Sequence, residues 1–153
     1  MTGPATLDRT GIAARIPHRD RMCLLDRLVG WTAGSIDCRS ASHRDADNPL
    51  RSASGLLAPC AIEYAAQAMA LHGSLVAPAG DVPKPGYLAS VRQVRLAVAT
   101  LHDVAGELHV RATRLAGDAR QILYQFSVGD DGGRVLAEGR ATVVLNTLPE
   151  TPA

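Results

Sequence analysis

The chain has 153 residues, enough for one domain with an ordinary hydrophobic core and with little room for a second. Its 16 basic residues are balanced by 15 acidic ones and form no cluster, which excludes the basic face that nucleic-acid binding requires. The sequence contains no apolar run near the roughly 20 residues that cross a bilayer, and its first ten residues do not resemble a signal peptide. We therefore expect a cytoplasmic protein without a membrane segment.

The first third of the chain predicts, in order, a short helix over residues 6–15, strands over residues 23–31 and 35–40, and a loop over residues 43–55. Thr6 is a good helix cap, and Pro17 ends the helix. Gly34 provides the turn between the two strands. The last of these segments is polar and contains Pro49 and Gly55, which is typical of a loop.

The strongest helical signal begins at Pro59 and extends to about Val76. Proline is favoured at a first helical position, and the residues after it are rich in Ala, Leu and Met. Few polar residues interrupt the apolar surface of this segment: Glu63, Tyr64, Gln67, His72 and Ser74. A helix that is apolar on nearly all sides is a buried helix.

A loop rich in Gly and Pro over residues 80–86 separates this helix from the last part of the chain. Four segments there show the pattern of strands, and they cover residues 87–100, 107–116, 120–129 and 134–145. Their connections have the chemistry of turns, most clearly at Asp131-Gly132-Gly133. A single antiparallel sheet that covers one buried helix has to curve around it. We therefore predict an α+β fold: one hotdog domain over residues 1–153, with a core at about 16–146 and five or six strands around one long helix.

Six short motifs lie along the same segments: Ile16-Pro17-His18-Arg19, Cys23-Leu24-Leu25-Asp26-Arg27, Ile62-Glu63-Tyr64-Ala65-Ala66-Gln67, the strand Leu88 to Arg95, Ala105-Gly106-Glu107-Leu108 and Leu136-Ala137-Glu138-Gly139. Their sequences and their order resemble the β-hydroxyacyl-acyl-carrier-protein dehydratases of bacterial fatty acid synthesis. The helix motif is most similar to the Ile-Glu-Tyr-x-Ala-Gln string of the dehydratase-like proteins of aryl-polyene biosynthesis. The resemblance implies a hotdog fold and chemistry on acyl thioesters.

The defining loop of the parent family, Gly-His-Phe-Pro, has no counterpart in this chain. Its histidine is the catalytic base of that family, and the interval counted back from Glu63 reaches Pro49 instead. The nearest histidine, His43, is six residues too early. The identity of the catalytic base therefore stays open: it is either His18, in the Pro-His-Arg motif, or His43.

Removal of water from a β-hydroxyacyl thioester needs a base for the α-proton and an acid for the departing hydroxyl. Glu63 lies among apolar helix residues, so we expect burial to raise its pKa and to make it a general acid. Gln67 lies one turn further on the same face, where it either holds the carboxyl group or binds the hydroxyl. His18 is the preferred base.

The negative charge that builds on the thioester oxygen needs hydrogen-bond donors. The start of a buried helix supplies unpaired N–H groups, here those of Ala58, Cys60 and Ala61. The remaining histidines have no catalytic task in this prediction: His72, His102 and His109.

Arg92 and Arg95 lie in one predicted strand and present positive charge. The resemblance implies that such residues face an acidic acyl-carrier protein, which would speed encounter.

The three cysteines, Cys23, Cys38 and Cys60, share no C-x-x-C spacing and are expected to be reduced core residues. The sequence has no metal-binding motif and indicates neither a metal nor another cofactor.

Three functions follow from these residues. The first is a dehydratase for β-hydroxyacyl thioesters of acyl-carrier protein. The second is a hotdog subunit without the loop histidine that completes a hetero-oligomer with an active dehydratase. The third is a hotdog thioesterase, in which a helix carboxylate activates water. A hotdog sheet has an edge that pairs readily, so we expect either a homodimer or a hetero-oligomer with another hotdog protein.

Overall fold

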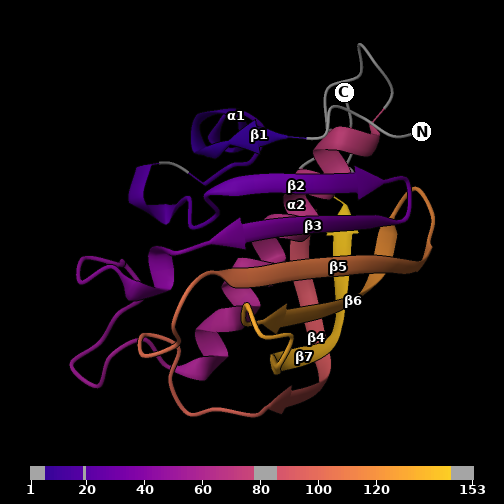
Figure 1. The fold of residues 1–153 in the computed structure, drawn as a ribbon. Coiled ribbons are helices and arrows are strands. Elements are labelled where there is room, and N and C mark those ends of the chain that lie inside the picture. Colours follow the sequence, from indigo (N-terminus) through magenta and orange to yellow (C-terminus); the bar gives the residue numbers. More distant parts are fainter. Residues whose placement is uncertain (1–5, 19, 78–85, 146–153) are drawn as a thin grey trace, which may run out of the picture.

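The computed structural model describes residues 6–18, 20–77 and 86–145 (Figure 1). In chain order its strands and α-helices are β1 (Leu7–Asp8), α1 (Arg9–Ala13), β2 (Arg27–Thr32), β3 (Ser35–Ser40), α2 (Ala61–Val76), β4 (Gly86–Leu96), β5 (Leu108–Gly117), β6 (Gln121–Gly129) and β7 (Val135–Leu145). Three single turns of 3₁₀ helix accompany them: η1 (Asp20–Met22), η2 (Ser42–Arg44) and η3 (Ala58–Cys60).

The strands form one sheet in the order β1-β2-β3-β5-β6-β7-β4, and every neighbouring pair is antiparallel. The described residues thus give seven strands rather than five or six. The additional strand is β1, whose two residues pair with Arg27 and Leu28 at the start of β2. This pairing also shortens the predicted first helix to Arg9–Ala13. Its cap is Asp8, whose side chain accepts a hydrogen bond from the Gly11 N–H at 2.9 Å, and not Thr6.

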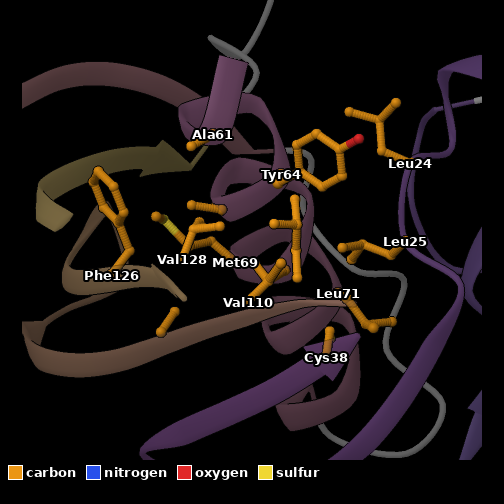
Figure 2. Packing of buried hydrophobic residues seen from close by; sticks show 14 of the residues in the cluster. Leu24, Leu25, Cys38, Ala61, Tyr64, Met69, Leu71, Val110, Phe126 and Val128 are labelled. Atoms are coloured by element: carbon orange, nitrogen blue, oxygen red, sulfur yellow. The ribbon is translucent and has the colours of Figure 1, made fainter. Parts of the chain in front are cut away.

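The apolar segment that begins at Pro59 forms the single long helix, as predicted, with η3 leading directly into α2. The helix packs mainly against β3, β5 and β6, and in Figure 1 it runs behind the curved sheet. Its inward side chains join those of the sheet in one apolar cluster that includes Tyr64, Met69 and Phe126 (Figure 2). The predicted hotdog fold is confirmed. Within the described residues, no helix has the length and apolar character needed to cross a membrane.

The last strand in the sheet order, β4, has no strand paired to its outer edge among the described residues. All of its residues are exposed or half-buried, whereas β5, β6 and β7 each have a buried inner face. Several of its large apolar side chains reach solvent: Tyr87, Leu88, Val94 and Leu96. An uncovered edge strand with exposed apolar residues is a surface where another chain pairs.

A polar pair lies inside the core near the end of α2. The buried His72 ring approaches the Tyr124 hydroxyl with Nδ1 at 2.7 Å and the Thr32 carbonyl oxygen with Nε2 at 2.8 Å. A carbonyl oxygen only accepts, so Nε2 carries the proton and donates it, and Nδ1 of the neutral ring accepts from the tyrosine. Burial lowers the pKa of His72 and raises that of Tyr124 to about 12. The neutral pair is therefore part of the folded state.

This pair predicts that the protein loses stability in mild acid. The unfolded chain protonates His72 near its ordinary pKa of 6.5, whereas the folded chain resists protonation until a lower pH. The stabilisation is therefore complete above about pH 6.5 and is lost as the pH falls, by at most ~1.4 kcal/mol per pH unit for one proton. Urea unfolding of the wild type and of His72→Phe at several pH values checks this. We expect the variant to be less stable at neutral pH but less sensitive to acid, and equal sensitivity would contradict it.

Candidate functional site

An acidic and a basic side chain meet at the first turn of α2. Oε1 of Glu63 lies 2.9 Å from Nε2 of His18. Glu63 comes from the helix, and His18 comes from the segment between α1 and η1. Their side chains are 33% and 24% exposed, so the pair is partly open to solvent. The structure thus brings together two of the residues that the sequence suggested separately.

Gln67 fixes this arrangement from one turn further along α2. Its Oε1 accepts a hydrogen bond from the Leu24 N–H at 2.8 Å, and its Nε2 donates to the Met22 carbonyl at 2.6 Å. The same Nε2 also lies 3.2 Å from Oε1 of Glu63. The side chain is fully buried, and all its hydrogen-bonding groups have partners. Of the two predicted tasks for Gln67, the contacts favour holding the carboxyl group over binding a hydroxyl.

The electrostatic state of Glu63 differs from the one that we predicted. Burial does favour the neutral acid, but the hydrogen bond from His18 outweighs it and lowers the pKa of Glu63 below its ordinary value of 4.5. The hydrogen bond from Gln67 acts in the same direction. The predicted raised pKa is therefore wrong, because the sequence did not show that a histidine would contact the carboxyl group. At neutral pH Glu63 is a carboxylate that accepts two hydrogen bonds.

The two ring nitrogens of His18 differ in their contacts. Nε2 faces the Glu63 carboxylate and donates to it. Nδ1 is buried and has no hydrogen-bond partner among the described residues. In the neutral ring this atom carries a lone pair, which is the group that a general base needs. Nδ1 of His43 and Nε1 of Trp31 are in the same state, so what distinguishes His18 is the Glu63 carboxylate at its other ring nitrogen.

His43 lies elsewhere and is buried rather than solvated. Its Nε2 lies 2.9 Å from the carbonyl oxygen of Val104, which fixes the 42–50 loop to the segment before β5. Burial lowers the pKa of this histidine. Of the two histidines suggested as the base, the structure places His18, and not His43, against Glu63.

The N–H groups at the start of the helix already have main-chain partners. Ala58 donates to the Ala99 carbonyl at 2.9 Å, Cys60 donates to Leu57 at 3.0 Å, and the N–H of Ala61 reaches the Ala58 and Pro59 carbonyls. Their predicted task at a thioester oxygen stays a prediction, and it requires that at least one of these bonds opens.

Burial raises the pKa of the Cys60 thiol, so this side chain is protonated at neutral pH.

The two arginines of the predicted carrier surface lie on β4, away from the Glu63–His18 pair. Arg92 faces Arg140 across the sheet, and Arg95 faces Glu138. Both arginines are exposed. No contact among the described residues joins them to Glu63 or His18, and their task in carrier binding stays a prediction.

A buried polar network that the sequence did not predict lies next to Glu63. The hydroxyl of Tyr64 accepts a hydrogen bond from Asn48 Nδ2 at 3.0 Å and shares another with the Ser42 hydroxyl at 2.8 Å. The Ser42 hydroxyl also reaches the Leu24 carbonyl at 2.7 Å. These contacts fix the 42–50 loop and the segment leading to β2 against α2. A tyrosine in an otherwise apolar helix face was the one available signal.

A cavity of about 430 Å³ opens at one end of the sheet, between the 98–105 segment and residues 130–136. Neither Glu63 nor His18 lines it. Within the described residues, no three His, Cys, Asp or Glu side chains gather in the way that a metal ion requires. The His18–Glu63 contact therefore lies outside this cavity.

Comparison with known proteins places this geometry in context. Residues 10–151 match the family model described as ApeP-like, ApeP dehydratase. No protein with a curated description matches the chain.

Solved structures resemble the chain over most of its length. A chain of the dehydratase heterocomplex ApeI:P from Xenorhabdus doucetiae is 22% identical, with 90% of this chain and 91% of that chain covered and a TM-score of 0.80. A thioesterase from Haemophilus influenzae is 15% identical, with 82% and 81% covered and a TM-score of 0.60. AziG from S. sahachiroi is 19% identical, with 77% and 88% covered and a TM-score of 0.56. At these identities the likeness shows a shared fold.

Proposed function

Because the chain belongs to the ApeP-like dehydratase family, we propose that it dehydrates β-hydroxyacyl thioesters carried by an acyl-carrier protein, in fatty acid or aryl-polyene synthesis. The dehydratase resemblance seen in the sequence is confirmed by the family match. The observation that carries the proposal is the 2.9 Å contact between His18 and Glu63 at the start of the buried helix. This pair provides both a proton acceptor and a proton donor.

The reaction requires that one proton is removed from the α-carbon and that one proton is delivered to the departing hydroxyl. In our proposal Nδ1 of His18 takes the α-proton, and the electron pair of the broken C–H bond moves towards the thioester oxygen. The Nε2 proton passes to Oε1 of Glu63, and the carboxyl group delivers a proton to the hydroxyl, which leaves as water while the carbon–carbon double bond forms. Gln67 keeps the carboxylate in place during the transfer. Nδ1 is buried in the single chain, so substrate binding has to expose it.

The test is mass spectrometry of a carrier-bound β-hydroxyacyl substrate incubated with the purified protein. We expect a product lighter by one water, with the acyl chain still attached to the carrier. A free β-hydroxy acid would instead indicate thioester hydrolysis, the activity named for the Haemophilus influenzae structure of the same fold. An unchanged substrate would contradict catalysis by this chain alone.

A second candidate function is that of a subunit that pairs with an active hotdog dehydratase. The uncovered β4 edge favours it, because a strand with unpaired main-chain groups and exposed apolar side chains is completed by another strand. The similar Xenorhabdus doucetiae structure is described as a heterocomplex. The same assay distinguishes the two functions: a subunit would be inactive alone and would support dehydration when mixed with its partner.

A further inference from the structure

The β4 strand carries positive charge on one side because of an irregularity in its pairing. Arg92 pairs with Arg140, and Arg95 pairs with Glu138. The two pairs are therefore three residues apart along β4 but only two residues apart along β7. The extra residue lies at a bulge where Gln93 has a φ of 53°, a conformation that non-glycine residues seldom adopt. In a regular strand, residues 92 and 95 would point to opposite faces. The bulge therefore turns both arginines to the same face.

That face is the outer one, away from the helix. Arg140 also pairs with Gln125 on β6, whereas its chain neighbour Ala141 pairs with Tyr124. Tyr124 is buried and contacts His72 of α2, so the Tyr124 side of the sheet is the inner side. Gln125, Arg140 and Arg92 thus belong to the outer face. Arg92, Arg95 and Arg140 are called here the arginine cluster.

The arginine cluster is not neutralised by the chain itself. Arg92 and Arg140 are directly opposite each other, an arrangement of like charges that weakens a sheet. None of the ion pairs among the described residues involves a member of the cluster. The residues of β4 include no Asp or Glu, and Glu138 is the one acid that pairs with the cluster across the sheet. The uncovered edge therefore carries a net positive charge.

The position of Arg92 makes pairing with a second copy unfavourable. Val91 is the middle residue of the 11-residue strand, and Arg92 follows it. If two copies of β4 paired antiparallel along their whole length, the two Arg92 residues would lie about 7–8 Å apart across the symmetry axis. Each would still have Arg140 on its other side, so four like charges would gather on one face.

We propose that β4 pairs with a hotdog chain of different sequence whose facing strand carries carboxylates, and that the arginine cluster disfavours pairing with a second copy. This inference rests on the second candidate function for the existence of a hotdog partner, and it names the chemistry by which that partner is chosen. Like-charge contacts suppress wrong partners, and specific interfaces combine such contacts with attractive ones. It also gives Arg92 and Arg95 a task other than receiving the carrier.

The experiment uses the chain and a charge-reversed copy as a surrogate acidic partner. The R92E/R95E/R140E variant is isotope-labelled, mixed with the wild type, and examined by native mass spectrometry at about 20 mM and about 500 mM salt. We expect mixed dimers to exceed their statistical share by at least about tenfold at low salt and to lose this preference at high salt. A control mixture uses R15E/R44E/R120E, which reverses three exposed arginines outside β4 and β7. It should show no such preference.

Two results would overturn the inference. One is a wild type that forms a tight homodimer and mixes with the variant in the statistical proportion. The other is the absence of mixed dimers while circular dichroism shows that both proteins are folded. The dehydration assay reports on the reaction and the mass measurement on the pairing, so failure of the one is distinguishable from failure of the other.

Discussion

Glu63→Gln is expected to lower the rate of dehydration by about 10²- to 10⁴-fold, the usual cost of losing a positioned acid–base group. The amide keeps the shape of the side chain and accepts hydrogen bonds from His18 and Gln67, but it can neither take the Nε2 proton nor deliver it to the hydroxyl. The fold should change little, because the substitution leaves the Gln67 contacts to Leu24 and Met22 in place. Turnover by mass spectrometry and the melting temperature of each variant check both parts.

A matched control is available in Glu107→Gln. The Glu107 side chain is 32% exposed and pairs with Arg27, so it has similar burial and also has a cationic partner. It should retain wild-type turnover. Gln67→Ala should reduce turnover less than Glu63→Gln but reduce stability more, because it leaves the Leu24 N–H and the Met22 carbonyl without partners. Wild-type turnover in Glu63→Gln would refute the catalytic task of this residue.

The parts of the fold that the sequence predicted well are those that depend on local periodicity. The helix after Pro59 and the strand β3 end where the pattern ends. The strand predicted to reach Thr100 ends instead at Leu96. The reason is non-local: Ala99 accepts a hydrogen bond from Ala58, which draws this segment from the sheet to the helix start.

The first long strand shows the same limit. Its predicted start at Cys23 followed from an apolar run, but the strand β2 begins at Arg27. Leu24 is buried and uses its main-chain groups elsewhere: its N–H donates to Gln67, 43 residues away, and its carbonyl oxygen accepts from Ser42. Side-chain partners so distant in sequence leave no periodic signal.

The sequence suggested the residues of the candidate site but did not show how their side chains contact one another. The resemblance to the dehydratases pointed to Glu63 and His18 independently. Neither motif indicates that the two side chains meet, and the direction of the Glu63 pKa depends on that contact. His43 lies in a polar run that predicts exposure, yet the Val104 carbonyl, 61 residues away, gives it a buried partner. The chemistry of the site therefore depends on tertiary contacts.

His18→Gln is expected to lower the rate of dehydration by about 10²- to 10⁴-fold as well. The glutamine amide can donate a hydrogen bond to the Glu63 carboxylate, but it has no lone-pair nitrogen that takes a proton at neutral pH. If the two residues act as one proton-transfer unit, the double variant His18→Gln/Glu63→Gln should be no slower than the slower single variant. Losses that multiply in the double variant would contradict a shared proton path.

A second substitution at this position, His18→Phe, tests the contact independently of activity. The hydrogen bond from His18 is the largest cause of the low pKa of Glu63, so its removal should raise that pKa. A carboxyl group with a lowered pKa stabilises the fold at pH values above its ordinary pKa of 4.5, and this stabilisation is lost as the pH falls. The stability of His18→Phe should therefore decrease less in acid than that of the wild type. Carbon NMR titration of the Glu63 carboxyl group measures the shift directly. An unchanged Glu63 pKa in His18→Phe would show that the two side chains do not interact in solution, and the proposed base would then have to be sought elsewhere.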